Sequence, residues 1–406
     1  MDSSLMKSKF GMFIHWGIYS EIEYHEQVFA HLKMNREDYE CHAKTFNPTE
    51  YDPDKWVKLA KDAGMTYICI TTKHHDGFCM WDTKYTDYKI TNTPYGKDIL
   101  KMLAESCKKH GMKLSLYYSC PDWNYEYGYN PNSSHQWMAK NKKNPDTEKL
   151  RDYIKCQIRE LLTEYGEIYT LFWDIPPKIL DRSINELVRS LQPGIFINDR
   201  GFDEGDFSTP ERDFEALPGQ RFKKATEACN SVGVNSWGYR RGENFYSIRY
   251  LTSSIDRIMA SGGSYLLNVG PDSRGIITKD YAERIRRVGD WYCRMDGCLE
   301  DNEPDDFEYG VYKNSYLVTK KDGKTYFHFY DGLIADHVCM DGYPSMPKRV
   351  RLLNNNATLP FEVTHLPFLN GFNETARIEG PSVLNIYNIP TDDFAAEPIV
   401  IEVEWK

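Results

Sequence analysis

The stretch YTLFWDIPP, residues 169–177, decides the fold of this 406-residue chain. Its first five residues are aromatic, aliphatic or β-branched, which is typical of a strand buried on both faces, as in a parallel sheet. The strand has to end at Asp174, because Pro176 and Pro177 cannot continue the pairing of a sheet. A carboxylate in this position lies at the rim of the sheet, where α/β folds place functional groups. Taken alone, Asp174 could instead cap the following turn, so the rest of the chain has to decide.

Strands and helices alternate on both sides of this stretch. Six further strands are expected, at 9–17, 67–72, 113–119, 195–197, 234–239 and 264–270. Amphipathic helices are expected at 52–64, 98–111, 146–166, 183–191, 245–260 and 279–295. The expected strands number seven, one fewer than in a closed eightfold barrel. The pattern therefore predicts an α/β fold, a (β/α)8-like barrel with one irregular unit. A doubly wound open sheet is the alternative, but the glycine-rich first turn that usually marks it is absent.

The sequence pattern changes after the acidic, turn-rich segment 301–306. Short alternating strands follow, without a convincing helix, at 316–319, 325–330, 349–353, 382–388 and 398–405. This pattern predicts a small β-sandwich. A chain of this length also favours two domains. We therefore expect a barrel-like catalytic domain over residues 1–303 and a C-terminal β-sandwich over residues 304–406.

Composition argues against several classes of partner. The net charge is −10 and the basic residues form no stripe, so nucleic acid is not an expected partner. No apolar run approaches the roughly 20 residues of a membrane helix, and residues 1–10 lack the apolar core of a secretion signal. We therefore expect no membrane association and a cytoplasmic protein, although a secreted protein whose signal peptide has been removed would look the same. The ten cysteines form no CxxC pair and are expected to be reduced thiols.

Polar side chains follow the ends of the expected strands. Because the carboxyl ends of barrel strands meet on one face, these groups should surround one cavity. They are His15, His74, His75, Tyr118, Asp174, Asn198, Asp199 and Arg200. Such a mixture suits a sugar, whose hydrolysis needs two carboxyl groups beside the glycosidic bond. Asp174 is the first candidate, and Glu211, in the stretch DFSTPE at 206–211, is the best candidate for the second.

Other kinds of catalysis are less well supported. His74, His75 and Asp76 are adjacent, but neighbouring side chains on extended backbone point to opposite sides, and no pair of histidines has the i,i+4 spacing of a helical metal site. The Gly-x-Ser-x-Gly turn of a serine nucleophile is also absent. We therefore expect neither a metal nor a cofactor.

Five motifs point to one family. They are KHHDGFCMWD at 73–82, LFWD at 171–174, IFINDRG at 195–201, DFSTPE at 206–211 and LLNVGP at 266–271. Together they resemble glycoside hydrolase family 29, the retaining α-L-fucosidases, and the resemblance runs in order over about residues 9–300. It implies an exo-acting enzyme that removes terminal α-L-fucose from a fucosylated oligosaccharide or glycoconjugate by double displacement.

The resemblance also implies roles for single residues. Asp174 matches the nucleophile of the family. Glu211 matches the acid/base, with Glu227 and Glu26 as rivals. Residues that match the binders of the sugar hydroxyls are His15, His74, His75, Tyr118 and Arg200. Trp237 matches an aromatic residue that packs near the methyl group of fucose.

The chain departs from the family pattern at several positions. Residues 27–30 read QVFA where many members have Glu-Trp-Tyr-Ala, so a carboxylate and an indole that contact the sugar are expected to be missing. Phe172 stands where tryptophan is common, Ile175-Pro176-Pro177 replaces a glycine-containing turn, and Arg212 follows Glu211. These departures leave open a related glycone such as L-galactose or a D-arabinose-like pentose. A glycan-binding protein without catalysis is a further alternative, against which the presence of both carboxyl groups argues. The loops 20–47 and 121–144 are expected to shape the aglycone side.

Overall fold

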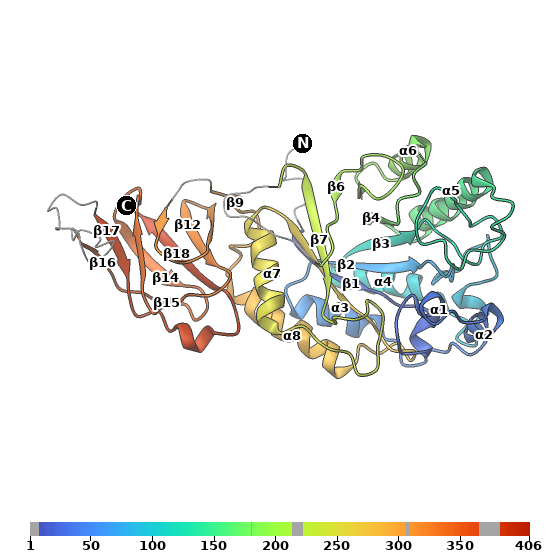
Figure 1. Ribbon diagram of the computed structural model, residues 1–406, viewed down its shortest axis with the longest axis horizontal. Coiled ribbons are helices and arrows are strands. Elements are labelled where there is room, and N and C mark those ends of the chain that lie inside the picture. The colour runs from blue at the N-terminus through green and yellow to red at the C-terminus, as the bar shows by residue number, and fades with distance from the viewer. Residues whose placement is uncertain (1–7, 180, 213–221, 306–308, 365–381) are drawn as a thin grey trace. The chain divides into compact units, whose positions relative to one another are not determined.

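The computed structural model describes residues 8–179, 181–212, 222–305, 309–364 and 382–406, and the described chain forms two compact units (Figure 1). The first unit contains the described residues of 1–213, 224–246 and 264–286. The second contains those of 214–223, 247–263 and 287–406. The division into separate domains at residue 303 stays a prediction.

The first unit is built on an eight-stranded parallel sheet, with the order β5-β4-β3-β2-β1-β8-β7-β6. Its strands are β1 (Phe10–Ile14), β2 (Tyr67–Lys73), β3 (Lys113–Ser119), β4 (Ile168–Asp174), β5 (Phe196–Ile197), β6 (Phe207–Ser208), β7 (Ala225–Ser231) and β8 (Ser264–Val269). The two edges meet, because Asn198 pairs with Phe207 and the Asp199 amide donates to the Phe207 carbonyl at 2.9 Å. The predicted (β/α)8-like barrel is confirmed.

The irregular unit of the barrel lies between β5 and β8. The prediction of a strand at 234–239 is wrong, since this segment is a loop after β7. The segment that forms β7, ATEACNS, is small and polar, and therefore lacks the apolar run by which a buried strand is recognised. β6 is only two residues long, and no strand was expected at its position.

Capping residues set the helix ends as the sequence predicts. The larger helices are α3 (Pro53–Asp62), α4 (Ile99–His110), α5 (Thr147–Glu164), α6 (Arg182–Leu191), α7 (Ile248–Ala260) and α8 (Lys279–Arg294), and the loop after β1 adds α1 (Val28–His31) and α2 (Arg36–Glu40). The side chain of Asp98 accepts from the Lys101 amide at 2.8 Å, and Gly111 ends α4 at φ +66°. Helix α7 begins three residues later than expected, because Ser247 caps it.

Alternate residues of each strand fill the interior of the barrel. A buried cluster of Phe13, Tyr67, Cys69, Tyr117, Phe172, Cys229 and Leu266 occupies it. These residues come from six strands, so the interior is a packed core. The rigid strand ends above this core carry the groups described below.

The second unit contains two antiparallel sheets. One has six strands in the order β15-β14-β18-β12-β11-β9, and the other four in the order β10-β13-β17-β16. The strands are β9 (Glu303–Pro304), β10 (Gly310–Val311), β11 (Leu317–Lys321), β12 (Lys324–Phe329), β13 (Val338–Asp341), β14 (Pro347–Leu352), β15 (Ala357–Thr358), β16 (Phe361–Thr364), β17 (Val383–Ile386) and β18 (Ile399–Trp405). Side chains of both sheets share one apolar core, as Phe327 and Ile401 do with Leu384 and Ile386. This is the expected β-sandwich.

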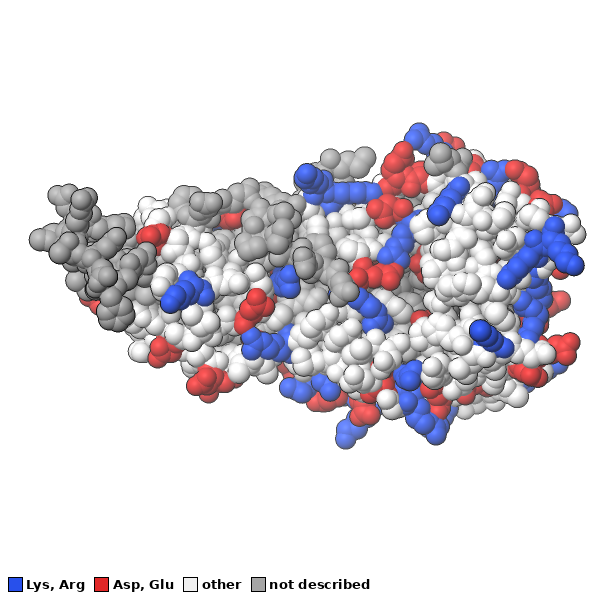
Figure 2. All heavy atoms as spheres, in the orientation of Figure 1, with Lys and Arg blue, Asp and Glu red and all other residues white. Residues whose placement is uncertain are grey.

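Charged side chains of both signs are interspersed over the face shown in Figure 2. Among the described residues, no helix has the length and apolar character to cross a membrane. The described His, Cys, Asp and Glu side chains form no group of three or more that could hold a metal ion. The expectations about nucleic acid, metal and cofactor stay predictions.

Candidate active site

A cavity of about 140 Å³ lies at the carboxyl ends of the barrel strands. It is lined by Phe13, His15, Glu26, Gln27, His74, His75, Tyr117, His135, Phe172, Asp174, Ile175, Glu211, Cys229 and Trp237. Seven candidate site residues from the sequence lie in this lining: His15, Glu26, His74, His75, Asp174, Glu211 and Trp237. Arg200 contacts two of them, whereas Tyr118 lies elsewhere.

Asp174, the last residue of β4, is held from three sides. Its Oδ2 accepts the Tyr117 hydroxyl at 2.6 Å, and its Oδ1 accepts from Arg200 Nη1 at 3.2 Å. The Nε2 of His75 lies 3.8 Å from Oδ2. Burial opposes ionisation, but these neighbours outweigh it and hold the pKa of Asp174 below its usual value. The carboxylate is therefore ionised at neutral pH, as a nucleophile has to be.

Arg200 joins the two candidate carboxyl groups. The same Nη1 that contacts Asp174 also donates to Glu211 Oε1, and Nη2 donates to the Thr209 carbonyl. Since one hydrogen bond spans about 3 Å, the two carboxylate oxygens are no more than about 6 Å apart. Carboxyl pairs of retaining glycosidases are about 5–5.5 Å apart, and those of inverting ones about 6.5–9.5 Å. The arrangement thus fits attack by one carboxylate more closely than attack by an intervening water.

Three buried histidines face the cavity. Nδ1 of His15 donates to the side-chain carbonyl of Asn268 at 2.7 Å, and Nδ1 of His75 donates to the Ser119 hydroxyl at 2.7 Å. His74 stacks on Tyr117 at 5.8 Å. Burial lowers the pKa of His15 and of His75 to about 4, and that of His74 well below its usual value. All three are therefore neutral near pH 7, and each Nε2 of His15 and His75 can accept a hydroxyl proton.

Comparison with known proteins gives this cavity a context. A sequence model of the alpha-L-fucosidase family matches residues 2–296. The chain belongs to this family. It is 25% identical over 359 residues to the tissue alpha-L-fucosidase of Rattus norvegicus. The aligned region covers 80% of this chain and 75% of the rat protein.

Solved structures agree with the family assignment. Alpha-L-fucosidase isoenzyme 1 from Paenibacillus thiaminolyticus is 30% identical, with a TM-score of 0.84 over 98% of this chain and 97% of that chain. An alpha-L-fucosidase from a Vibrio strain is 26% identical, with a TM-score of 0.84 over 98% of this chain and 72% of that chain. The resemblance to glycoside hydrolase family 29 is thereby confirmed, and this α-L-fucosidase family member is a glycoside hydrolase.

The tyrosine of β3 that faces the cavity is Tyr117, not the expected Tyr118. Successive side chains of a strand point to opposite faces, so only one of the two can face the barrel axis. The hydroxyl of Tyr118 donates to Gln157 of α5 at 2.6 Å and accepts from Lys73 at 3.0 Å. Tyr118 therefore stabilises the packing of α5 against the outside of the barrel. It lies beside the buried ion pair of Lys73 and Asp122.

The carboxylate expected to be missing after β1 is present one residue earlier. Glu26 lines the cavity, so the expectation of its loss is wrong. Its Oε2 accepts from the Ser236 hydroxyl at 3.0 Å and from the amides of Trp237 and Gly238 at 2.9 and 3.2 Å. The side chain next to it in the cavity is Gln27, and no indole comes from this loop, as the sequence of this α-L-fucosidase family member predicts.

Arg212 does not bring a charge into the cavity. Its guanidinium lies 4.7 Å from the ring centre of Trp237 and donates to the Val234 carbonyl at 2.7 Å. The cavity lining includes Trp237 and not Arg212. Trp237 lies 6.2 Å from Phe13, and together with Phe172 these rings form an apolar wall. Arg212, one of the departures from the family pattern, is therefore not part of the cavity lining.

Glu227, a rival acid/base, lies inside the barrel and not in the cavity lining. Its Oε2 accepts the Tyr67 hydroxyl at 2.5 Å, and its Oε1 has no hydrogen-bond partner among the described residues. Burial raises the pKa of Glu227 to about 7, although the Tyr67 hydrogen bond opposes the shift. A carboxyl group at this depth cannot reach a leaving group, so Glu211 is the better candidate in this family member.

The raised pKa of Glu227 predicts a pH dependence of stability. Between about pH 4.5 and 7 the folded chain keeps a proton that the unfolded chain has lost, so the free energy of unfolding falls as pH rises. Glu227→Gln removes this dependence. Relative to the wild type, the variant should gain up to about 3 kcal/mol between pH 4.5 and 8, measured by denaturant unfolding. If the free energies of unfolding of Glu227→Gln and the wild type differ by the same amount at pH 4.5 and at pH 8, the prediction is contradicted.

Proposed function

We propose that this protein is an exo-acting retaining α-L-fucosidase, with Asp174 as the nucleophile and Glu211 as the acid/base. The observation that supports this most directly is the Arg200 nitrogen shared by both carboxylates at one cavity. The upper limit of about 6 Å that it sets between one oxygen of each group is compatible with the carboxyl spacing of a double displacement.

In the first step Asp174 attacks the anomeric carbon of the sugar. The bond from that carbon to the leaving oxygen breaks, and Glu211, entering the step protonated, gives its proton to this oxygen. A covalent glycosyl-enzyme results. In the second step Glu211 takes a proton from a water molecule, whose oxygen attacks the anomeric carbon and releases Asp174. Two inversions give net retention of configuration.

The remaining residues would bind the glycone. His15, His74 and His75 exchange hydrogen bonds with its hydroxyls, and the ionised Glu26 accepts a further one. Arg200 stabilises the charge that passes between the carboxylates and the reacting centre. The apolar wall of Phe13, Phe172 and Trp237 receives the methyl group of fucose.

The direct test is release of nitrophenol from p-nitrophenyl α-L-fucoside, beside the α-L-galactoside, the β-D-arabinopyranoside and the β-D-galactoside. We expect cleavage of the fucoside, with α-L-fucose as the first product seen by proton NMR. The β-anomer appearing first would indicate an inverting enzyme and would contradict the roles given to both carboxyl groups. No cleavage of any of the four, together with tight binding of fucose, would favour a glycan-binding protein.

A related glycone is the second candidate, and Gln27 favours it. Its amide brings a donor and an acceptor into the cavity beside Glu26, in a loop that contributes no indole. A sugar with a hydroxymethyl group in place of the methyl could use them. Cleavage of the α-L-galactoside in preference to the fucoside would support this candidate and leave the mechanism unchanged.

A further inference from the structure

The long loop between β3 and α5 reaches the cavity through His135. The ring of His135 lies 5.5 Å from that of His75, and His135 lines the same cavity as Asp174 and Glu211. None of the three histidines that bind the glycone comes from this loop. His135 therefore adds a polar group at the cavity from an element outside the barrel strands.

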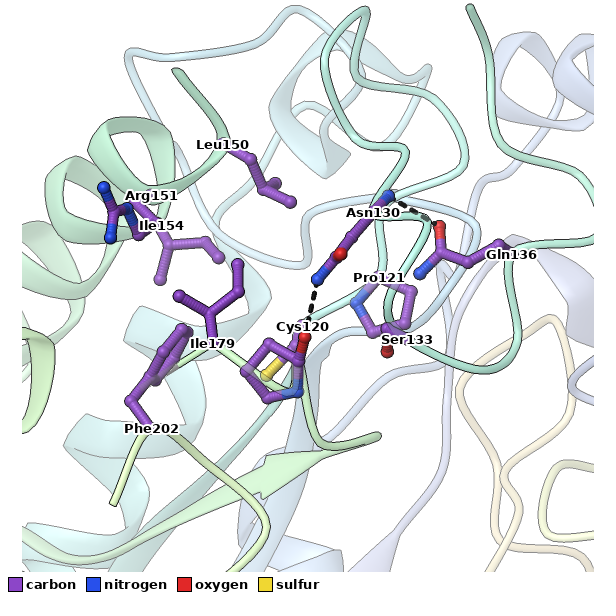
Figure 3. A pocket seen from close by; sticks show the side chains of 11 residues that line it. Cys120, Pro121, Asn130, Ser133, Gln136, Leu150, Arg151, Ile154, Ile179 and Phe202 are labelled. Atoms are coloured by element: carbon purple, nitrogen blue, oxygen red, sulfur yellow. Dashed lines mark hydrogen bonds between the residues drawn. The ribbon is translucent and has the colours of Figure 1, made fainter. Parts of the chain in front are cut away.

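The loop is fixed to the turn that follows the nucleophile. The side-chain amide of Asn130 donates to the Pro177 carbonyl at 2.7 Å, and the Asn130 backbone amide donates to Gln136 at 3.2 Å (Figure 3). Ser133 donates to the Pro176 carbonyl at 2.9 Å. Because proline restricts the backbone, these two carbonyls are rigid acceptors. The loop is thus positioned relative to Asp174, which lies two residues before Pro176.

A second set of contacts fixes the end of the loop that carries His135. The indole nitrogen of the buried Trp123 donates to the His135 carbonyl at 2.7 Å. His135 itself has φ +58°, a conformation that non-glycine residues adopt only when surrounding contacts hold it. The segment from Ser133 to Trp137 is therefore held on both sides, although it contains neither helix nor strand.

Trp137 stands beside His135 with its ring open to solvent. Its exposed fraction is 52%, and its ring centre lies 4.6 Å from that of His135. Among the large exposed apolar side chains of the described chain, it is the only tryptophan. Lys142 donates to its carbonyl at 2.6 Å. A solvent-exposed indole next to a polar group at a cavity provides the flat apolar surface and the hydrogen bond that a sugar ring needs.

We propose that His135 and Trp137 bind the leaving-group sugar, the residue to which the glycone is attached. Trp137 stacks on the apolar face of this sugar, and His135 exchanges a hydrogen bond with one of its hydroxyls. The proposal rests on the proposed function, since it requires that Asp174 and Glu211 mark the scissile bond. It identifies His135 and Trp137 as the residues that set the preference for a sugar as the leaving group.

The test compares two substrates in the wild type and in Trp137→Ala. One is the fucosylated oligosaccharide that the wild type cleaves best among α1,2, α1,3, α1,4 and α1,6 linked forms, and the other is α-L-fucosyl fluoride, whose leaving group cannot stack. We expect kcat/KM for the oligosaccharide to fall about tenfold, mainly through KM, and kcat/KM for the fluoride to stay unchanged. Equal losses on both substrates, or no loss on either, would overturn the proposal.

Two further variants control for the substitution itself. Trp137→Tyr keeps an aromatic surface and should restore most of the oligosaccharide activity. Tyr85→Ala removes an exposed aromatic ring that does not line the cavity, and should change neither substrate. A wild type that does not hydrolyse the fluoride would show instead that the proposed function fails, which is a distinct result from loss of selectivity.

Discussion

Asp174→Gly is expected to lower turnover of p-nitrophenyl α-L-fucoside by roughly 10⁴-fold or more, because it removes the atom that forms the covalent bond to the sugar. Asp174→Asn should be nearly as impaired, since an amide keeps the shape of the carboxylate but attacks poorly. Asp174→Gly removes the acceptors of both Tyr117 and Arg200, and Asp174→Asn replaces one of the two oxygens by an NH2 group, so the free energy of unfolding has to be measured beside the kinetics.

Added azide distinguishes a lost nucleophile from a disturbed site. In Asp174→Gly the azide ion can occupy the space of the carboxylate, attack the anomeric carbon and yield the β-fucosyl azide, with partial recovery of the rate. Asp199→Asn is the matched control, because Asp199 also follows a strand of the barrel but contacts Lys224 and does not line the cavity. It should retain activity. Near-normal turnover in Asp174→Gly, or the absence of the azide product, would remove Asp174 from the role of nucleophile.

Glu211→Ala has the second-largest expected effect, and its size should depend on the leaving group. An oligosaccharide needs a proton on its leaving oxygen, so kcat/KM for it should fall by about 10²–10⁴-fold. A dinitrophenyl fucoside needs little protonation, and its first step should be nearly unaffected. The second step still lacks its base, so the glycosyl-enzyme should accumulate and give a burst of dinitrophenol.

Controls for this variant come from a buried glutamate outside the cavity lining. Glu227 does not line the cavity, so Glu227→Gln should show the same dependence of kcat/KM on the leaving group as the wild type. Azide added to Glu211→Ala should attack the glycosyl-enzyme without a base and give the α-fucosyl azide. A Glu211→Ala enzyme that cleaves both substrates equally slowly would assign the acid role to another residue, for which Glu26 is the remaining carboxyl group at the cavity.

The barrel could be predicted because most of its strands are apolar runs that end at polar residues. Such runs have no other way to satisfy burial than a sheet covered on both faces. β7 was not predicted because it is not an apolar run. Its buried residues are Thr226, Glu227, Ala228, Cys229 and two polar residues beyond, and a local stretch of sequence does not show that the barrel interior accommodates them. β6 is too short to carry a pattern.

The positions of site residues at strand ends could be predicted, but not always the face of the strand from which the side chain projects. Tyr117 and Tyr118 are chemically equal, and only the register of β3 against its neighbours decides which one faces the cavity. Glu26, His135 and Trp137 lie in long loops, whose conformation depends on distant contacts such as those from Ser236 and Pro177. The family resemblance named Glu26 as a rival acid/base, but its place beside Trp237 in the cavity wall could not be read from the sequence.

The two prolines after Asp174 also bear on how such an enzyme can change over generations. The two candidate carboxylates line the barrel cavity, whereas the loop that carries His135 and Trp137 is attached to the carbonyls of Pro176 and Pro177. On the proposed roles, substitutions at His135 or Trp137 would change which linkage is cleaved and leave the strand that carries Asp174 intact, so selection could act on the preference for a leaving group separately from the bond-breaking chemistry.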